Sequence, residues 1–401
     1  MDKSEIQELL SRQPNNLSLI GEFYSNENIF TMEMSNILFN HWICVGHESK
    51  LENIGDWFKY DISTESIIII RGKDNEVRAV HNVCRHRGSR ICRKKKGNSN
   101  ILTCPYHAWS FDSKGNLISS NNTSPNLDKE QWGLHKVPLQ IINGLILICL
   151  GDKPPSLENA KSSIKEGLGP YGWEKAKIAH TKTYSFNANW KLAVDNYQEC
   201  LHCNSVHKEF SRSHAIVRPD SEVVEIRKQA KDKIENMGIS IPTVLNWPHA
   251  LSENEEMVAC FHDALFEGYQ TGSKDGLPVA PLMGDFKSHD GGVTYFDIGP
   301  ISFFLAYPDH GVLFSFVPQS IDKTDLEISW LVSNSAIDGQ DYDLNHLTWL
   351  WDSTTIEDKD VVEGAQKGVI SRFYQPGPYG PMETAIESFK DWYLKHIKGL
   401  L

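Results

Sequence analysis

Residues 84–112, CRHRGSRICRKKKGNSNILTCPYHAWSFD, contain two short loops in which a histidine closely follows a cysteine. Cys84 and His86 have the spacing Cys-x-His, and after 17 intervening residues Cys104 and His107 have the spacing Cys-x-x-His. Two thiolates and two imidazoles suit a tetrahedral zinc ion. They also suit a two-iron two-sulfur cluster of the Rieske kind, to which each loop gives one cysteine and one histidine. The near-mirror form of the two loops favours the cluster.

The sequence around these loops, from His41 to about Asp152, alternates short β-rich runs with turn residues, which predicts a small all-β domain. The runs are WICVG (42–46), SIIIIRG (66–72), VRAVHNV (77–83), ILTC (101–104), WSFD (109–112) and GLILICLG (144–151). Lys153, Pro154 and Pro155 then indicate a linker.

A second group of metal-ligand residues lies in NWKLAVDNYQECLHCNSVH, residues 189–207. Apolar side chains three or four residues apart predict a helix over residues 186–209, with His202 and His207 near its end. Non-haem Fe(II) sites use two histidines and one carboxylate and leave positions open for oxygen and substrate. A zinc site with Cys200 and Cys203 is the alternative, but we interpret these cysteines as packing thiols.

Both motifs resemble those of the Rieske non-haem iron oxygenases, the ring-hydroxylating family, and specifically their catalytic alpha subunits. CRHRG and CPYHAWSFD are similar to the Rieske domain of that family, and NWK…DNY.EC.HC…VH to its catalytic domain. Pro105 and Tyr106 differ from respiratory Rieske proteins, which carry an extra cysteine in each loop. The resemblance extends from Trp42 to YGPMETAIESFKDWYL, residues 379–394.

The resemblance implies further site residues. In IEDKDVVEGAQ, residues 356–366, it makes Asp358 the third iron ligand, with Gln366 eight residues later and with Asp360 and Glu357 as rivals. It makes Glu199 the carboxylate that links the iron of one subunit to the cluster of its neighbour, where many relatives have aspartate. It also includes Asn196 among the catalytic residues.

The expected fold class is α+β, with a small all-β Rieske domain and a larger catalytic domain in which helices flank a central antiparallel sheet. We expect a helical leader over residues 1–40 that packs on the catalytic domain, the Rieske domain over 41–152 and the catalytic domain over 153–401. Within the last, strands are predicted in 292–317 and 326–332, and helices over 341–366 and 384–397.

The resemblance implies one 2Fe-2S Rieske cluster and one Fe(II) per subunit, dioxygen as co-substrate, and a homotrimer. The chain has no GxGxxG fingerprint, so NAD(P)H is expected to act only through a separate flavin and iron–sulfur reductase. A basic run between the cluster ligands is either an ordinary solvated loop or a docking patch for that acidic partner. The run consists of Arg85, Arg87, Arg90, Arg93, Lys94, Lys95 and Lys96.

Composition restricts the function classes. A formal net charge of −12 disfavours binding to nucleic acid and to anionic membranes. The longest apolar run, 141–150, is about half the length of a membrane-spanning helix, and the N-terminus lacks the apolar core of a secretory signal. We therefore expect a cytoplasmic protein. Its 8 cysteines are too few for a disulfide scaffold.

The substrate is predicted from the form YQECLHC around Glu199, which resembles the branch of the family that acts on choline, carnitine and betaines. That branch implies monooxygenation with N-demethylation or C–N cleavage. Aromatic faces for a cation are expected from Trp247, Phe303, Phe304 and Tyr307, which are otherwise ordinary core residues. The alternatives are hydroxylation of an aromatic acid, a Rieske electron-transfer protein without oxygenase activity, and a zinc-stabilised binding module.

Overall fold

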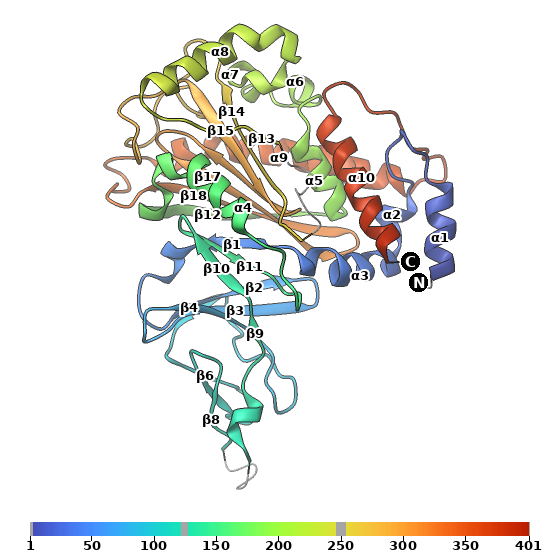
Figure 1. Ribbon diagram of the computed structural model, residues 1–401, viewed down its shortest axis with the longest axis vertical. Helices are drawn as coiled ribbons and strands as arrows, with labels where there is room; N and C mark the ends of the chain where they lie inside the picture. Colours follow the sequence, from blue (N-terminus) through green and yellow to red (C-terminus); the bar gives the residue numbers. More distant parts are fainter. Residues whose placement is uncertain (1–2, 122–126, 246–253, 401) are drawn as a thin grey trace.

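The computed structural model describes residues 3–121, 127–245 and 254–400 of the chain. A β-rich lobe, drawn in blue and teal, lies below a larger body built around one broad sheet (Figure 1). The N-terminus and the C-terminus lie side by side at one flank of the larger body (Figure 1).

The β-rich lobe contains three antiparallel sheets, with the strand orders β1-β11-β10, β5-β2-β3-β4-β9 and β6-β7-β8. Its strands are β1 (Ile43–His47), β2 (Asp56–Ile62), β3 (Glu65–Arg71), β4 (Val77–His81), β5 (Lys96–Asn98), β6 (Ile101–Thr103), β7 (Ser110–Asp112), β8 (Leu117–Ser119), β9 (Lys136–Val137), β10 (Leu139–Ile142) and β11 (Leu145–Ile148). The sequence ESIIIIR of β3 is apolar throughout its centre because this strand is buried on both faces.

The larger body is built on an antiparallel sheet of seven strands in the order β12-β18-β17-β16-β15-β14-β13. The strands are β12 (Ala176–Phe186), β13 (Val244–Leu245), β14 (Val258–Ala264), β15 (Gly292–Ile298), β16 (Ser302–Ala306), β17 (Gly311–Ser320) and β18 (Lys323–Ser333). Together with the β-rich lobe, this sheet confirms the predicted α+β fold class.

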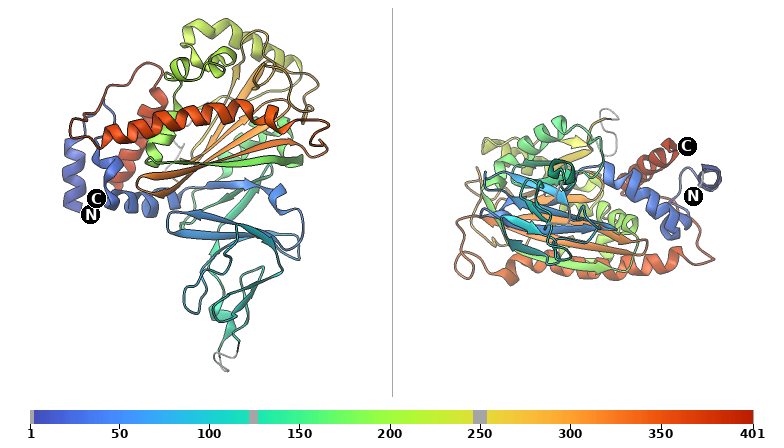
Figure 2. Two further views of the ribbon diagram at one scale, coloured as in Figure 1. Left: turned by 180° about the vertical axis from the view of Figure 1, so that it is seen from behind. Right: turned by 90° about the horizontal axis from the view of Figure 1, so that it is seen from below.

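Helices cover both faces of the large sheet. On one face α4 (Glu158–Gly167) shares an apolar cluster with Cys260, Phe296 and Phe304. On the other, α5 (Trp190–Gln198) and α9 (Leu344–Val369) pack in a second cluster. Helix α9 crosses the whole sheet (Figure 2). Successive side chains of a strand point to opposite faces, so each strand contributes to both layers.

Three N-terminal helices pack beside the C-terminal helix α10 (Thr384–Gly399). They are α1 (Lys3–Arg12), α2 (Glu22–Ser25) and α3 (Glu27–Asn36). Glu33 of α3 accepts hydrogen bonds from Trp190 Nε1 at 2.9 Å and Lys191 Nζ at 2.6 Å, and also from the Tyr393 hydroxyl. This buried network ties α3, α5 and α10 together.

Three further helices lie along the edge of the sheet near β14 (Figure 1). They are α6 (Cys203–Val206), α7 (Phe210–Ser213) and α8 (Asp220–Asn236). The sequence did not predict the 17-residue helix α8, whose apolar residues are sparse among charged ones.

The lobe and the larger body share one apolar cluster that contains Ile43 and Phe58 of the lobe as well as Phe316 of the sheet. Polar contacts also cross between them. Ser302 Oγ accepts a hydrogen bond from the Cys44 backbone N–H at 3.0 Å. The division of the chain at residues 41 and 153 stays a prediction.

The helix predicted over residues 186–209 is wrong. Strand β12 continues to Phe186, α5 begins at Trp190 with Asn189 as its N-cap, and Glu199 is extended with φ −128° and ψ 156°. The predicted strand region 292–317 contains three strands, β15, β16 and the start of β17. Among the described residues, no helix combines the length and the apolar character that crossing a membrane requires.

Candidate metal centres and substrate cavity

The two cysteine–histidine loops of the β-rich lobe have the same backbone hydrogen bonds. The Cys84 N–H donates to Ser89 O at 2.9 Å, and the Cys104 N–H donates to Trp109 O at 2.8 Å. In return the N–H groups four residues after each cysteine, those of Gly88 and Ala108, donate to the cysteine carbonyls. Both of these residues have positive φ, 69° and 58°. The loops are thus a structural pair, as their near-mirror sequence predicts.

The side chains of these loops divide by type. The sulfur-bearing Cys84 and Cys104 are 3% and 2% exposed, whereas His86 and His107 are only partly buried and their ring centroids lie 4.6 Å apart. Within the described residues, His86 Nδ1 is buried and has no hydrogen-bond partner, although Trp109 stacks on the ring at 5.0 Å. A buried ring nitrogen without a partner fits a metal ligand. Two inner thiols and two outer imidazoles fit a cluster with one iron on each side.

The environment of Cys84 also fits this arrangement. Burial raises the pKa of the Cys84 thiol, and its closeness to Cys104 acts in the same direction. Backbone N–H groups of His86 and Arg87 donate to the sulfur and partly offset the shift. Such N–H donors stabilise the negative charge of a thiolate bound to metal.

Three donor atoms converge at the end of α5 and the middle of α9. His207 Nε2 lies 3.1 Å from His202 Nε2 and 2.9 Å from Asp358 Oδ1. Asp358 Oδ1 lies 3.2 Å from His202 Nε2. Donor atoms about 2.1 Å from one ion and at right angles to one another are about 3.0 Å apart. The three separations therefore fit one face of an octahedral ion.

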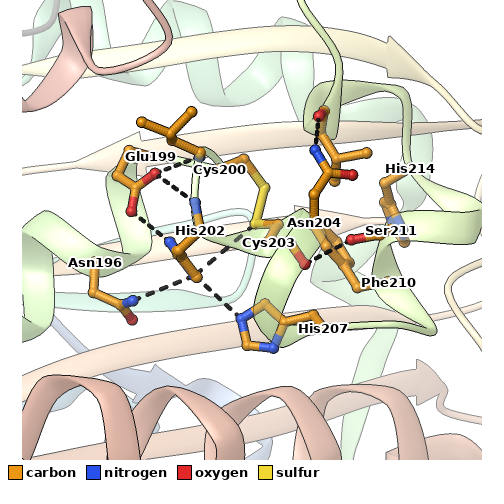
Figure 3. Close-up of a disulfide and its surroundings, with 12 residues drawn as sticks. Asn196, Glu199, Cys200, His202, Cys203, Asn204, His207, Phe210, Ser211 and His214 are labelled. Atoms are coloured by element: carbon orange, nitrogen blue, oxygen red, sulfur yellow. Dashed lines mark hydrogen bonds and ion pairs between the residues drawn. A yellow bond between two sulfur atoms is a disulfide. The ribbon is translucent and has the colours of Figure 1, made fainter. Parts of the chain in front are cut away.

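Each histidine has a second carboxylate on its other ring nitrogen. His202 Nδ1 hydrogen-bonds Glu199, and His207 Nδ1 lies 2.7 Å from Glu357 Oε2. The Asn196 amide is 3.3 Å from His202 Nε2, and Figure 3 shows Asn196 and Glu199 approaching His202 from the same side. Partners of this kind fix the tautomer and the orientation of a metal-bound imidazole.

The two histidines and Asp358 shift one another's pKa values. Burial opposes the charged form of His202, but the bonds to Asp358 and Glu199 outweigh it and raise its pKa to about 9. The same balance, with Asp358 and Glu357 as partners, raises the pKa of His207. Burial opposes the charge of Asp358, but the two histidines hold its pKa below its usual range. A bound cation would replace the protons that these shifts retain.

The structure brings Asp358 to the histidines and keeps its rivals away from the donor face. Asp360 is exposed, and Glu357 binds the outer nitrogen of His207. Gln366 accepts a hydrogen bond from the Asn189 backbone N–H at 2.8 Å, which locks α9 to the start of α5.

Cys200 and Cys203 form a disulfide, which corrects their interpretation as packing thiols. The Cys203 sulfur lies 3.9 Å from His202 Nε2, so the two cysteines bracket this histidine (Figure 3). A sulfur engaged in a disulfide is not available as a thiolate ligand. The arrangement therefore speaks against the alternative zinc site of His202, Cys203 and His207.

A cavity of about 670 Å³ opens directly beside the three donor atoms. Its lining includes the donors themselves and aromatic side chains from five elements. These aromatic residues are Tyr197, Phe210, Phe261, Tyr295 and Trp351. The volume suits a small organic molecule held next to the donor face.

Phe303, Phe304 and Tyr307, which were predicted to bind substrate, are absent from the lining of this cavity. Phe303 is covered by Tyr197, and Phe304 points to the opposite face of the sheet. Tyr307 packs between His214 and His310. Trp247 lies outside the described residues.

Sequence reasoning also missed Asp297, which lines the cavity from β15. The available signal was the acidic residue inside the strand-like run GVTYFDI, residues 292–298.

The chain is similar to known proteins along most of its length. A family model described as the ring hydroxylating alpha subunit (catalytic domain) matches residues 173–399, and a model of the Rieske 2Fe-2S domain matches residues 41–138. A glycine betaine monooxygenase oxygenase subunit from Pseudomonas aeruginosa (strain UCBPP-PA14) is 31% identical over 394 residues, covering 97% of this chain and 91% of the relative.

Two further matches agree with this result. A carnitine monooxygenase oxygenase subunit from Acinetobacter baumannii (strain ATCC 19606) is 28% identical over 360 residues, covering 88% of this chain and 85% of the relative. The crystal structure of the quaternary ammonium Rieske monooxygenase CntA superimposes with a TM-score of 0.72 at 23% identity, covering 96% of this chain and 97% of that chain. At this identity the structural match establishes the fold.

Proposed function

Because this chain belongs to the Rieske non-haem iron oxygenases, as an alpha-type oxygenase subunit with one Rieske cluster and one mononuclear iron, we propose that it hydroxylates a small quaternary ammonium or N-methyl compound. The observation that carries the proposal is the aromatic-lined cavity that opens beside His202, His207 and Asp358. A cation is attracted to aromatic faces, and an aromatic cavity next to the iron ligands suits such a substrate.

We assign Cys84, His86, Cys104 and His107 to the cluster, and His202, His207 and Asp358 to the iron. The paired loops and the buried, unpartnered His86 Nδ1 support the first assignment. The three converging donor atoms support the second. When bound, the cluster supplies single electrons and the iron supplies the means to activate dioxygen.

The residues around the iron ligands have separate tasks in this proposal. Glu199 and Glu357 hold the outer ring nitrogens and so fix which nitrogen of each histidine faces the metal. Asn196 adds a polar group beside His202 Nε2 at the cavity wall. Tyr197 and Phe210 keep this wall largely apolar, which limits the access of water.

The proposed reaction inserts one oxygen atom into a C–H bond next to nitrogen. Dioxygen, two electrons and two protons convert an N-methyl group to N-hydroxymethyl, and the second oxygen atom leaves as water. The N-hydroxymethyl group then breaks down to formaldehyde and the demethylated amine. The related proteins named for glycine betaine and carnitine support this substrate class.

Electron transfer in this proposal crosses between subunits of a homotrimer. Within one chain, β6 and β8 of the cluster lobe lie at the end remote from α5 and α6 (Figure 1). Each centre also has an exposed apolar neighbour, Tyr106 at 57% beside His107 and Leu201 at 49% beside His202. A head-to-tail contact that closes into a ring would cover both, with Glu199 between the two centres.

An oxygenase subunit works with a separate reductase, and we propose an NAD(P)H-dependent flavin and iron–sulfur protein as that partner. The exposed cations of the loop between the cluster ligands support an acidic docking surface on the partner. Arg85 and Arg90 of the same run also donate hydrogen bonds to the carbonyls of Gly133 and Thr64, which fixes their side chains against the lobe.

The test is a substrate panel with protein loaded with both metal centres, a reductase and NADH. Glycine betaine, carnitine and choline form one group, and benzoate and salicylate form the other. We expect substrate-dependent NADH oxidation together with formaldehyde or a cleaved amine in the first group only. Hydroxylated aromatic acids in place of these products would overturn the proposal.

A further inference from the structure

Asp297 lies in β15, on the face of the sheet that lines the cavity. The register pairs it with Ala259 of β14 and with Phe303 of β16. Because side chains alternate along a strand, Phe296 and Ile298 point into the apolar cluster on the opposite face. An acidic side chain therefore interrupts an apolar strand at a position that faces the cavity.

The carboxylate of Asp297 has no hydrogen bond and no ion pair within the part of the chain that the structure describes. The other acidic side chains of the cavity lining are paired. Glu199 and Asp358 bind the histidines, and Asp220 pairs with Arg227 at 2.6 Å. Asp297 thus provides the one carboxyl group without a hydrogen-bond or ion-pair partner among the described acidic residues of this lining.

Burial alone raises the pKa of Asp297 to about 8. No neighbouring group contributes a second cause, which agrees with the missing partner. Burying a carboxylate without a partner costs free energy, and a cation supplied from outside the chain would recover part of this cost. A side chain of this kind in a cleft is a candidate for ligand binding.

The surroundings of Asp297 suit one kind of cation. Phe261 and Tyr295 form a parallel stack with centroids 4.9 Å apart, and Tyr197 covers Phe303 at 4.6 Å. Of these, Tyr197, Phe261 and Tyr295 line the cavity and offer it ring faces and few hydrogen-bond acceptors. A primary ammonium group needs acceptors for its three N–H groups, whereas a quaternary ammonium group has none and gains from ring faces and from an opposite charge.

We propose that Asp297 is the counter-ion of the substrate's quaternary ammonium group and selects a substrate with this charged group over one that has an uncharged group of the same shape. The inference rests on the proposed function and names the residue that recognises the substrate. It assigns Asp297 to binding, without a role in the oxygenation chemistry.

The experiment compares glycine betaine with 3,3-dimethylbutanoate, in which carbon replaces the charged nitrogen. Calorimetric titration of the metal-loaded protein measures the two dissociation constants. In the wild type we expect betaine to bind more tightly. Asp297→Asn should weaken betaine binding by about tenfold or more and leave the isostere within about threefold, so that the preference disappears. Steady-state kinetics should show a higher KM for betaine with a smaller change in kcat.

Two further variants complete the test. Asp297→Glu keeps the carboxylate and should retain the preference for betaine. This variant still tests the inference if Asp297→Asn fails to fold. Asp325→Asn changes a partly exposed aspartate of β18 that does not line the cavity, and should leave both dissociation constants unchanged. The visible spectrum of the cluster reports that each variant is loaded.

The outcomes separate this inference from the proposed function. A wild type that demethylates betaine, with Asp297→Asn binding betaine equally well, would overturn the role of Asp297 and leave the function standing. A wild type that oxidises only aromatic acids would overturn both.

Discussion

Asp358 Oδ1 lies 2.9 Å from His207 Nε2, although 151 residues separate them in the chain. Helix α9 makes this contact possible because its 26 residues span the sheet and bring its middle turns to the end of α5. Helix α9 thus positions Asp358, the third donor residue, whereas both histidines belong to one short segment.

Asp358→Asn should remove the mononuclear iron and retain the cluster. The change takes away the one anionic donor of the three, and the remaining histidines also lose a partner. We expect activity to fall by more than about a hundredfold. Losing a residue that binds the metal directly should cost more activity than losing a residue that only hydrogen-bonds a metal ligand. Iron and acid-labile sulfide analysis, together with the visible spectrum, measures the two centres separately.

Asp360→Asn is the matched control for that variant, since it makes the same change two residues away on an exposed position of α9. It should keep full iron content. Iron loss in this control, with normal iron in Asp358→Asn, would show that the rival carboxylate is the ligand.

Glu199→Gln should slow electron transfer between the centres while both remain loaded. The amide keeps a hydrogen bond to His202 and loses the negative charge. We expect reduction of the cluster by the reductase to be normal, and its reoxidation with substrate and oxygen to fall about ten- to a hundredfold. Stopped-flow absorbance follows both steps. Glu357→Gln, at the other histidine, should instead lower iron affinity; equal reoxidation rates in the two variants would contradict the assignment.

The affinity for a quaternary ammonium substrate should rise with pH. Such a cation carries no proton to lose, so the dependence must come from the protein. With the pKa of Asp297 at about 8, each pH unit below that value should weaken binding by about tenfold, and the curve should level off above it. Calorimetric titration from pH 6 to 9 measures this, and Asp297→Asn should give a flat profile.

Tyr197, Tyr295, Cys260 and Arg227 do not titrate in that range. The pKa values of Tyr197 and Tyr295 lie well above their usual value, burial raises that of Cys260 to about 12, and Arg227 stays charged beside Asp263.

The raised pKa of Asp297 also affects the stability of the fold. Between about pH 4 and pH 8 folded Asp297 keeps a proton that the unfolded chain has lost, so its contribution to the free energy of unfolding falls as pH rises.

Lys191→Met should destabilise the fold strongly. Lys191 Nζ and Glu33 Oε1 form a fully buried pair at 2.6 Å, and removing the cation leaves Glu33 uncompensated. We expect a loss of about 3–5 kcal/mol in the free energy of unfolding, measured with urea. The exposed pair of Arg12 and Glu22 is the control, and Arg12→Met should cost less than about 1 kcal/mol. Similar losses in both variants would contradict this view.

Reduction of the cluster by an acidic reductase should slow as salt is added. Arg93, Lys94 and Lys95 are exposed on the loop between the cluster ligands, where they attract an opposite charge over about 10 Å. Replacing all three by glutamine should lower the second-order rate several-fold and flatten its salt dependence, as measured by stopped flow. Glutamine at Lys228 and Lys231 of α8 should change neither. If the rate of cluster reduction in the wild type does not depend on salt, these cations are not a docking patch for the reductase.

The metal-ligand candidates could be proposed from the sequence because ligand spacing within a loop is a local property. His86 and His107 needed only the two cysteines nearby to be recognised as a set. The break in the helix at Glu199 was missed, since apolar spacing continues through it. The structure shows the cause, because the Glu199 side chain accepts hydrogen bonds from the backbone N–H groups of Leu201 and His202 and so competes with the helix.

The lining of the cavity could not be predicted, because it depends on which face of each strand turns toward α5 and α9. Phe303 and Phe304 are adjacent and chemically identical, yet they belong to opposite layers. Composition identifies both as aromatic and cannot distinguish them. Asp297 was missed for the same reason, because only the register with Ala259 and Phe303 shows that its side chain is on the cavity face of the sheet.

The alternation along β15 and β16 also bears on how such an enzyme can diversify. Positions 295, 297 and 305 line the cavity, while positions 296 and 304 pack in the apolar cluster that holds the sheet against α4. Substitutions at the first set can therefore change the shape and charge of the cavity without disturbing the packing that the second set provides. One fold could in this way accept new substrates through changes at alternate residues of a strand.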